Sequence, residues 1–223
     1  MQSRTKLLIG DTACEKLKNS SVIVFGVGGV GGYVVECLVR AGVGNITIVD
    51  FDVVDSSNIN RQIIALNSTV GKPKVEVMHS RIIDINPSAN VVALNLKYCK
   101  DTYDQFDLSK YDFVVDAIDI VTDKIELIVR AHKANADIIS ACGAGNRYDV
   151  PNFVVDDIYK TYNDGLAKVL RKKLREMGID KHTVVYTQSK PTFKSDVVGS
   201  ISYYPAMCGA VMAGYIVNKL IGE

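Results

Sequence analysis

The chain has 223 residues, of which 48% are apolar and 23% charged, and it carries a net charge of +1. This composition is typical of a globular protein with a sizeable core, and no apolar run reaches the roughly 20 residues of a membrane span. The chain start lacks the apolar core of a signal peptide, and the five scattered cysteines form no C-x-x-C pair, which argues against a disulfide framework or zinc knuckle and favours a cytoplasmic protein.

The first part of the chain predicts a nucleotide-binding βαβ unit. Residues 11–17 indicate a short helix with Asp11 or Thr12 as its N-cap, followed by an apolar strand at 22–25. A glycine-rich turn, a helix over 33–41 and a second strand over 46–49 come next, and the unit ends at Asp50. A strand, a glycine turn, a helix and an acidic strand end in this order are the pattern of such units.

The glycines of this turn have separate expected tasks. Gly26 allows a sharp exit from the strand, and Gly28 and Gly29 let a phosphate approach the backbone N–H groups at the helix start. Gly31 permits close packing of the helix on the strand, and Asp50 lies where a carboxylate can accept ribose hydroxyls. This pattern alone fits NAD, FAD and ATP equally well.

The residues after Asp50 favour ATP over NAD. A simple NAD domain has no need of a second carboxylate at Asp52, or of Arg61 and Lys74 close behind it. Two such cations are suited to bind the β- and γ-phosphates of a nucleoside triphosphate and to stabilise a pyrophosphate leaving group.

The remaining pattern predicts a doubly wound, mostly parallel α/β sheet in one domain, residues 1–223. The nucleotide-binding core is expected over 1–150, and a crossover, a basic segment and a C-terminal helix over 151–223. The strands are expected at 90–96, 111–119, 137–141, 153–158 and 183–187. The helices are expected at 73–85, 122–135, 166–177 and 204–220, with a short loop or helix at 108–110.

Two carboxylates stand at or near the end of the expected strand 111–119. A carboxylate that faces a triphosphate is a natural Mg²⁺ ligand, because magnesium prefers oxygen donors and shares them with phosphates. The alternative is that such a residue accepts backbone N–H bonds or caps the next helix. We expect Asp119 to bind the metal and Asp116 to be structural.

A basic segment over 160–194 holds nine Lys and Arg residues against three acids, so the rest of the chain carries a net charge of −5. This asymmetry suggests a polyanionic partner, although a solvated helix face is the simpler interpretation. Cys142 is expected to be a small buried residue, and no role is assigned to the histidines. The basic residues are Lys160, Lys168, Arg171, Lys172, Lys173, Arg175, Lys181, Lys190 and Lys194.

Together these motifs resemble the adenylation core of the ThiF/MoeB/HesA superfamily, the relatives of ubiquitin-activating enzymes. They are Gly-x-Gly-Gly-x-Gly, Asp50-x-Asp52, Ser57-Asn58-x-x-Arg61-Gln62, Gly71-x-Pro73-Lys74 and Asp116-x-x-Asp119. The resemblance covers essentially the whole chain and implies a Rossmann-like ThiF/MoeB adenylation fold. Within the superfamily the chain is most similar to the bacterial tRNA threonylcarbamoyladenosine dehydratases.

This resemblance implies a homodimer that uses ATP and Mg²⁺ to activate the carboxylate of a modified adenosine next to the tRNA anticodon, so that the side chain closes into a ring with loss of water. It implies that Arg61 and Lys74 bind phosphates, Asp50 the ribose and Asp119 the metal, and that Arg4 reaches into the partner's site. Further nucleotide contacts are expected from the four glycines, Asp52, Asn58 and Gln62. The anticodon stem-loop is expected to bind Lys168, Arg171, Lys172 and Arg175, with base stacking on Tyr159, Tyr162 or Tyr186.

Two alternatives stay open. The first is a MoeB- or ThiF-like enzyme that adenylates the C-terminus of a small sulfur-carrier or ubiquitin-like protein, with a possible sulfur-transfer partner. Such enzymes often use a cysteine after the adenylation core, and residues 143–207 contain none, which favours the dehydratase. The second is a non-catalytic module that binds ATP or NAD.

Overall fold

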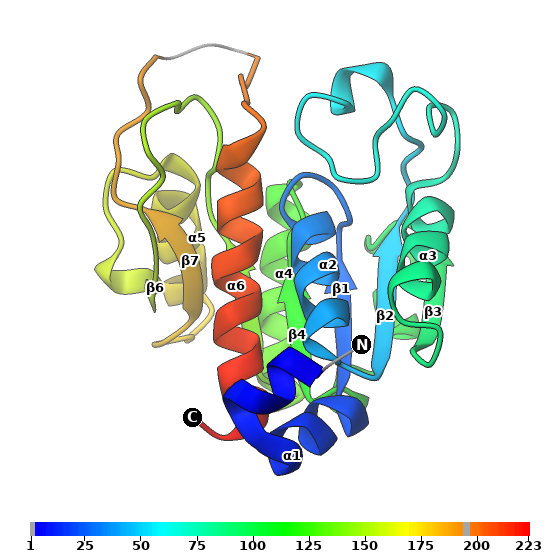
Figure 1. Cartoon of the computed structure of the whole chain (residues 1–223). Coiled ribbons are helices and arrows are strands. Elements are labelled where there is room, and N and C mark those ends of the chain that lie inside the picture. The colour runs from blue at the N-terminus through cyan, green and yellow to red at the C-terminus, as the bar shows by residue number, and fades with distance from the viewer. Residues whose placement is uncertain (1–2, 194–196) are drawn as a thin grey trace.

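The chain forms one seven-stranded sheet with helices on both faces (Figure 1). The structure, a computed structural model, describes residues 3–193 and 197–223, so Lys194 lies outside the described residues. The strand order is β3-β2-β1-β4-β5-β7-β6, and every neighbouring pair is parallel except β6 with β7. The strands are β1 (Ser21–Phe25), β2 (Asn45–Asp50), β3 (Asn90–Asn95), β4 (Phe113–Asp116), β5 (Ile138–Ala141), β6 (Phe153–Asp157) and β7 (Thr183–Thr187).

Six α-helices are found in the described residues; five of them cover the two faces of the sheet, and the N-terminal one lies across its lower end in Figure 1. Figure 1 shows α2 and α6 in front of the sheet and α4 and α5 behind it. The helices are α1 (Ser3–Asn19), α2 (Gly31–Ala41), α3 (Lys74–Ile85), α4 (Val121–Lys133), α5 (Gly165–Glu176) and α6 (Tyr203–Ile221). Short 3₁₀ turns lie at Ser56–Asn58, Tyr103–Gln105, Leu108–Lys110 and Ile158–Lys160. None of the described helices has the length and apolarity needed to cross a bilayer.

The two layers create two hydrophobic cores, because successive side chains of a strand point to opposite faces. Val22 and Val24 of β1 pack with α2, α3 and α6, whereas Ile23 and Phe25 pack with α4 and α5. Strands buried on both faces read as continuous apolar runs, which is why β1, β2 and β4 were visible in the sequence.

The predicted doubly wound, mostly parallel fold is confirmed, and the element bounds differ most at two places. The strand expected over 111–119 covers only Phe113–Asp116, because the chain turns at Ala117 to meet the glycine loop. The helix expected over 11–17 is the second part of α1, which starts at Ser3 and is kinked at Gly10 (φ 80°, ψ 172°). Only glycine adopts such a backbone conformation without strain.

Candidate active site

A cavity of about 420 Å³ lies at the carboxyl ends of β1, β2 and β4. In open α/β sheets ligands bind in this crevice, where the strand order reverses. Nine of the predicted site residues line the cavity: Gly26, Gly28, Gly29, Asp50, Asp52, Arg61, Gln62, Lys74 and Asp119. The sheet thus gathers into one place residues that are up to 93 positions apart in the sequence.

The glycine turn leaves backbone N–H groups free at the start of α2. Gly26 has φ 87° and lies against Ala117, and a Cβ on Gly31 would stand 1.8 Å from the Gly26 carbonyl oxygen. The N–H groups of Gly28, Gly29 and Val30 donate to no partner among the described residues, and Val30 provides no side-chain cap. Free donors at a helix N-terminus are what a phosphate group requires.

Asp50 is held rigidly at the end of β2. Its Oδ2 accepts a hydrogen bond from the Val27 N–H at 2.8 Å, and its Oδ1 accepts one from the Asp52 N–H at 2.9 Å. Burial raises the pKa of Asp50, while these two N–H groups and Lys74 oppose the rise. Each oxygen keeps a lone pair with which to accept a ribose hydroxyl.

Lys74 is buried at the wall of the cavity, with 6% of its surface exposed. Its Nζ lies 2.7 Å from Oδ2 of Asp52, and its backbone N–H donates to the Asp52 carbonyl oxygen at 2.9 Å. A buried ammonium requires a partner, because its unpaired burial is costly. Asp52 therefore fixes the position of the Lys74 charge at the cavity.

Arg61 and Gln62 extend the same wall. The Arg61 guanidinium donates through Nη1 to the Ser57 carbonyl oxygen at 3.0 Å and to Asn60 Oδ1 at 2.9 Å. Its other guanidinium N–H groups have no partner among the described residues and can bind a phosphate. Gln62 is buried, and its Oε1 has no hydrogen-bond partner among the described residues. A buried polar atom without a partner on a cavity wall indicates a place for a polar ligand.

Asp119 and Asp116 are in different environments. Asp119 is exposed, lines the cavity and has no hydrogen-bond or ion-pair partner in the described part of the chain. Asp116 is fully buried, where its Oδ2 pairs with Nζ of Lys124 at 2.8 Å and its Oδ1 accepts from the Ile118 N–H at 3.1 Å. Asp116 therefore holds the turn that carries Asp119.

Three predicted residues do not line this cavity. Asn58 closes a reciprocal capping box with Asp55, and Gly31 contacts the Gly26 backbone. Arg4 is exposed on the first turn of α1 and does not line the cavity of its own chain. The protomer by itself therefore gives Arg4 no contact with the site.

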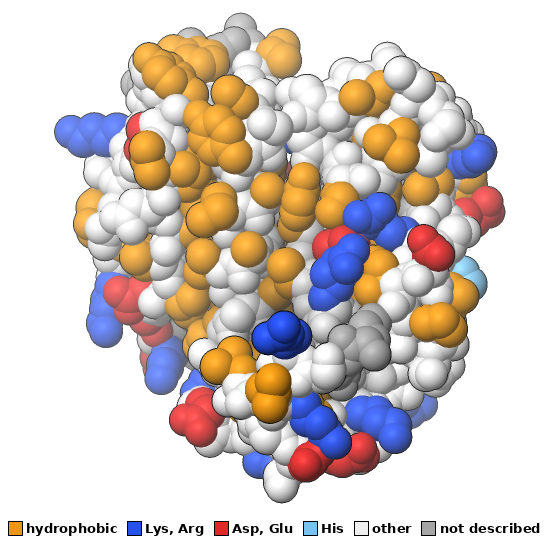
Figure 2. All heavy atoms as spheres, in the orientation of Figure 1, with side chains coloured by type: hydrophobic (Ala, Val, Ile, Leu, Met, Phe, Trp, Pro, Cys, Tyr) orange, Lys and Arg blue, Asp and Glu red, His pale blue; other side chains and the backbone are white. Residues whose placement is uncertain are grey.

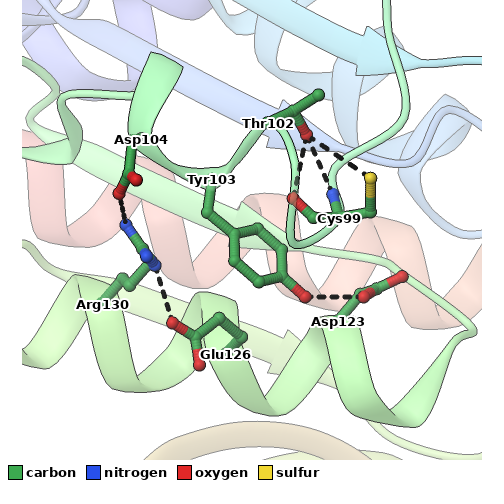
Figure 3. Close-up of polar contacts among 7 residues, drawn as sticks. All are labelled: Cys99, Thr102, Tyr103, Asp104, Asp123, Glu126 and Arg130. Atoms are coloured by element: carbon green, nitrogen blue, oxygen red, sulfur yellow. Dashed lines mark hydrogen bonds and ion pairs between the residues drawn. The ribbon is translucent and has the colours of Figure 1, made fainter.

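The sequence did not reveal that residues 96–98, in the segment that follows β3, line the cavity. Tyr98 lines the cavity, and its buried hydroxyl has no partner among the described residues. Figure 3 shows how this segment is fastened to α4: the Tyr103 hydroxyl donates to Asp123 at 2.7 Å, and Arg130 joins Asp104 to α4 at 2.7 Å. The aromatic residues of this segment were a weak signal of a site, because aromatic residues in a loop usually indicate only core packing.

The basic helix α5 presents part of its charge to solvent. Lys168 and Lys172 are exposed, whereas Arg171 donates to the Thr161 carbonyl oxygen at 2.9 Å. The Arg175 guanidinium lies over the Tyr159 ring at 5.0 Å. The suggestion that Tyr186 stacks on a base is wrong, because that side chain is 1% exposed and packs in the core of α4 and α5.

Cys142 is buried near the site, and burial raises the pKa of its thiol well above the usual range. A thiol in this environment is a poor nucleophile. The described residues contain no cluster of three or more His, Cys, Asp or Glu side chains able to hold a metal. Any metal at this site would take most of its ligands from a bound nucleotide and water.

Comparisons with known proteins agree with this geometry. The ThiF family matches residues 2–223. The chain is 43% identical to the tRNA threonylcarbamoyladenosine dehydratase of Bacillus subtilis, over 99% of this chain and 94% of that protein. It is 31% identical to a molybdopterin-synthase adenylyltransferase of Haemophilus influenzae, over 72% of this chain and 65% of that protein.

A solved structure extends the likeness to three dimensions. The tRNA N6-threonylcarbamoyladenosine dehydratase of Escherichia coli in complex with ATP superimposes with a TM-score of 0.93 at 32% identity, over 98% of this chain and 92% of that one. The match confirms the predicted Rossmann-like fold and the resemblance seen in the motifs. The chain belongs to the ThiF family.

Proposed function

We propose that the protein is an ATP-dependent tRNA threonylcarbamoyladenosine dehydratase. The observation that carries the proposal is that one cavity collects the glycine turn, Asp50, Arg61 and Lys74, in a chain that matches a dehydratase over almost its full length. These groups are what a nucleoside triphosphate requires: free N–H donors and cations for phosphates, and a carboxylate for the ribose.

The cavity residues have distinct proposed tasks. Asp50 accepts the ribose hydroxyls, and the Gly28–Val30 N–H groups bind a phosphate. Lys74 and Arg61 neutralise the β- and γ-phosphates, so that they stabilise the charge that develops as pyrophosphate leaves. Because Asp52 holds Lys74 in place before ATP binds, that cation needs no rearrangement during the reaction.

Mg²⁺ fits the site through Asp119. Its carboxylate is exposed to the cavity and without a partner among the described residues, and magnesium commonly binds one or two carboxylates together with substrate phosphates. When bound there, the ion supplies charge neutralisation to the phosphates. Asp116 keeps Asp119 in place through the Ile118 N–H.

The proposed chemistry activates a carboxylate and then closes a ring. An oxygen of the substrate carboxylate attacks the α-phosphorus of ATP, and pyrophosphate leaves. A nucleophilic atom of the same side chain attacks the activated carbonyl carbon, loses its proton, and AMP leaves with the carboxylate oxygen. An intramolecular attack gains about 7–11 kcal/mol from proximity in well-oriented cases, so no enzyme nucleophile is needed, which suits the buried Cys142.

We further propose that tRNA binds on the basic face of α5, through the exposed Lys168, Lys172 and Arg175 and the half-buried Arg171. Phosphate contacts of this kind make binding strongly dependent on salt. A tRNA substrate also implies a cytoplasmic reaction.

The homodimer is a proposal as well. Leu7 and Leu8, about one turn after Arg4, are 82% and 84% exposed. Figure 2 shows apolar side chains gathered over the face on which α2 and α6 lie in Figure 1. A second copy over this face would cover that apolar surface. The same contact would bring Arg4 toward the partner's cavity.

Adenylation of a carrier protein is the alternative, supported by the likeness to a molybdopterin-synthase adenylyltransferase. That likeness is lower and covers less of both chains than the match to the dehydratase. A sulfur-transfer partner would belong to this alternative, and a non-catalytic nucleotide module would bind ATP without turnover.

The test is mass spectrometry of nucleosides from threonylcarbamoyladenosine-containing tRNA incubated with the protein, ATP and Mg²⁺. We expect a mass decrease equal to one water, lost in Lys74→Ala and retained in the control Lys72→Ala, whose exposed side chain does not line the cavity. No mass change with intact tRNA and ATP would refute the proposal. Pyrophosphate exchange that needs a Gly-Gly-ended carrier protein would support the alternative.

A further inference from the structure

Arg147 is an almost completely buried arginine, 5% exposed, whose hydrogen-bond partners are all neutral. Its Nε donates to the Ser189 carbonyl oxygen at 3.0 Å, and its Nη2 donates to that of Asn163 at 3.0 Å. Its Nη1 donates to the carbonyl oxygens of Gly143 and Gly145, at 3.1 and 3.0 Å. One planar guanidinium thus joins three segments that are distant in the sequence.

The first of these segments is also fastened to the start of α5. The Gly143 N–H donates to Oδ2 of Asp164 at 2.9 Å, and Oδ1 of Asp164 caps α5 by accepting from the Ala167 N–H at 2.9 Å. Asp164 is itself buried. The N-terminus of the basic helix is therefore placed relative to Gly143 by two buried charged residues, Arg147 and Asp164.

The same segment lines the cavity proposed to bind ATP. Ala144 and Gly145 line the cavity together with Val198 and Ser200. Asn146 ties the two stretches together, because its backbone N–H donates to the Gly199 carbonyl oxygen at 2.8 Å and its Oδ1 accepts from the Gly199 N–H at 2.7 Å. The packing is so close that a Cβ on Gly145 would stand 2.2 Å from Val198.

We propose that Arg147 is a positioning residue that aligns the RNA-binding side of the protein with the nucleotide cavity. This inference rests on the proposed function, in which RNA binds on α5 and its carboxylate must meet the α-phosphate. Arg147 fixes the distance between the start of α5 and the wall at Ala144 and Gly145, so that an RNA docked on the helix presents its reacting group to the cavity in a defined place.

The chemistry of the residue supports a positioning task. Burial of a guanidinium is unfavourable unless its donors are satisfied, and an apolar side chain would fill the same space without that requirement. The fixed fork of an arginine imposes directions on the groups that it binds. None of the residues proposed to bind ATP, which come from the glycine turn, Asp50, Arg61, Lys74 and Asp119, is hydrogen-bonded to Arg147.

The test compares Arg147→Met and Arg147→Lys with a matched control, Arg81→Met. Arg81 also makes hydrogen bonds through Nε and Nη2, but to Glu36 between α2 and α3, away from the cavity. The kcat at saturating ATP and RNA, the KM for RNA, and the Kd for ATP without RNA are measured. Hydrogen exchange in segments 143–147, 163–165 and 188–190 is followed in parallel.

For Arg147→Met we expect kcat to fall about 10- to 100-fold, the loss that a misplacement of about 1 Å can cause. The Kd for ATP should stay within about threefold of the wild-type value, since the ATP-binding groups keep their own support. Exchange should rise in the three segments. Arg147→Lys retains the charge but not the fork, so it should show the same loss of kcat even if Arg147→Met does not fold. The control should lose stability and keep its kcat per folded molecule.

An unchanged kcat per folded molecule in both Arg147 variants would overturn the inference, because Arg147 would then contribute to stability alone. A Kd for ATP that weakens in proportion to kcat would overturn it as well, because Arg147 would then support the nucleotide site itself. Failure of the wild-type protein to dehydrate the RNA would instead refute the proposed function, and the inference with it.

Discussion

Removal of one partner from the buried ion pair between Lys124 and Asp116 should lower the free energy of unfolding strongly, whereas removal of both should not. Both side chains are fully buried, and Nζ of Lys124 lies 2.8 Å from Oδ2 of Asp116. The variant Lys124→Met removes the cation and leaves a carboxylate unpaired in the core. Loss of one partner of such a pair costs about 3–5 kcal/mol. At about 2–4 °C per kcal/mol for a chain of this size, the melting temperature should fall by about 6–20 °C.

The measurement is urea unfolding and thermal melting of the wild-type protein, Lys124→Met and the double variant Asp116→Asn/Lys124→Met. The double variant should recover most of the loss, because it leaves no unpaired charge behind. The amide oxygen that Asp116→Asn introduces can still accept from the Ile118 N–H, as Oδ1 of Asp116 does in the wild type. A single variant within about 1 kcal/mol of the wild type, or a double variant no more stable than the single one, would refute this account of the pair.

Three further predictions follow from the packing of the described residues. Gly31→Ala should abolish ATP binding measured by calorimetry, because the new Cβ would stand 1.8 Å from the Gly26 carbonyl oxygen; binding at wild-type affinity would contradict the close approach. Burial lowers the pKa of His182 to about 3, below its unfolded value near 6.5. The free energy of unfolding is therefore unaffected by this residue above about pH 6.5 and falls as the pH drops toward 3, because the unfolded chain binds the proton first. The free energy of unfolding should fall by about 2 kcal/mol from this residue at pH 5, a loss absent in His182→Gln, and equal pH dependence in the two proteins would argue against it. The Cys142 thiol should resist a thiol-specific reagent until urea unfolds the chain, and rapid labelling of the native protein would show that its burial is incomplete.

The parts of the fold that follow local rules could be predicted from the sequence. Apolar runs bounded by glycine or acidic residues located β1, β2 and β4, and the glycine turn marked one wall of the cavity. The sequence did not indicate that β6 pairs antiparallel with β7 at the edge of the sheet. The position and direction of such a strand depend on the path of the connecting segments and not on the local apolar pattern.

The long-range polar contacts of the site were harder to predict. Lys124 gave one usable clue, since it precedes Ile128 and Ala131 at helical spacing on the buried face of α4 and therefore needs a buried carboxylate. Arg147 gave none, because its partners are backbone carbonyl groups, which every residue carries. Asn58 matched a nucleotide-binding motif, yet its side chain is occupied with Asp55.

The location of the cavity between two groups of loops bears on how such proteins can diverge. The residues proposed to bind ATP all precede Asp123, in the segments that follow β1, β2 and β4, whereas Ala144, Gly145 and Val198 belong to later connections. Loops tolerate insertion and replacement far better than the strands that carry them. The later connections and α5 can therefore change to receive a different substrate, while the residues proposed to bind ATP are retained. One activating unit can in this way come to serve substrates of different kinds.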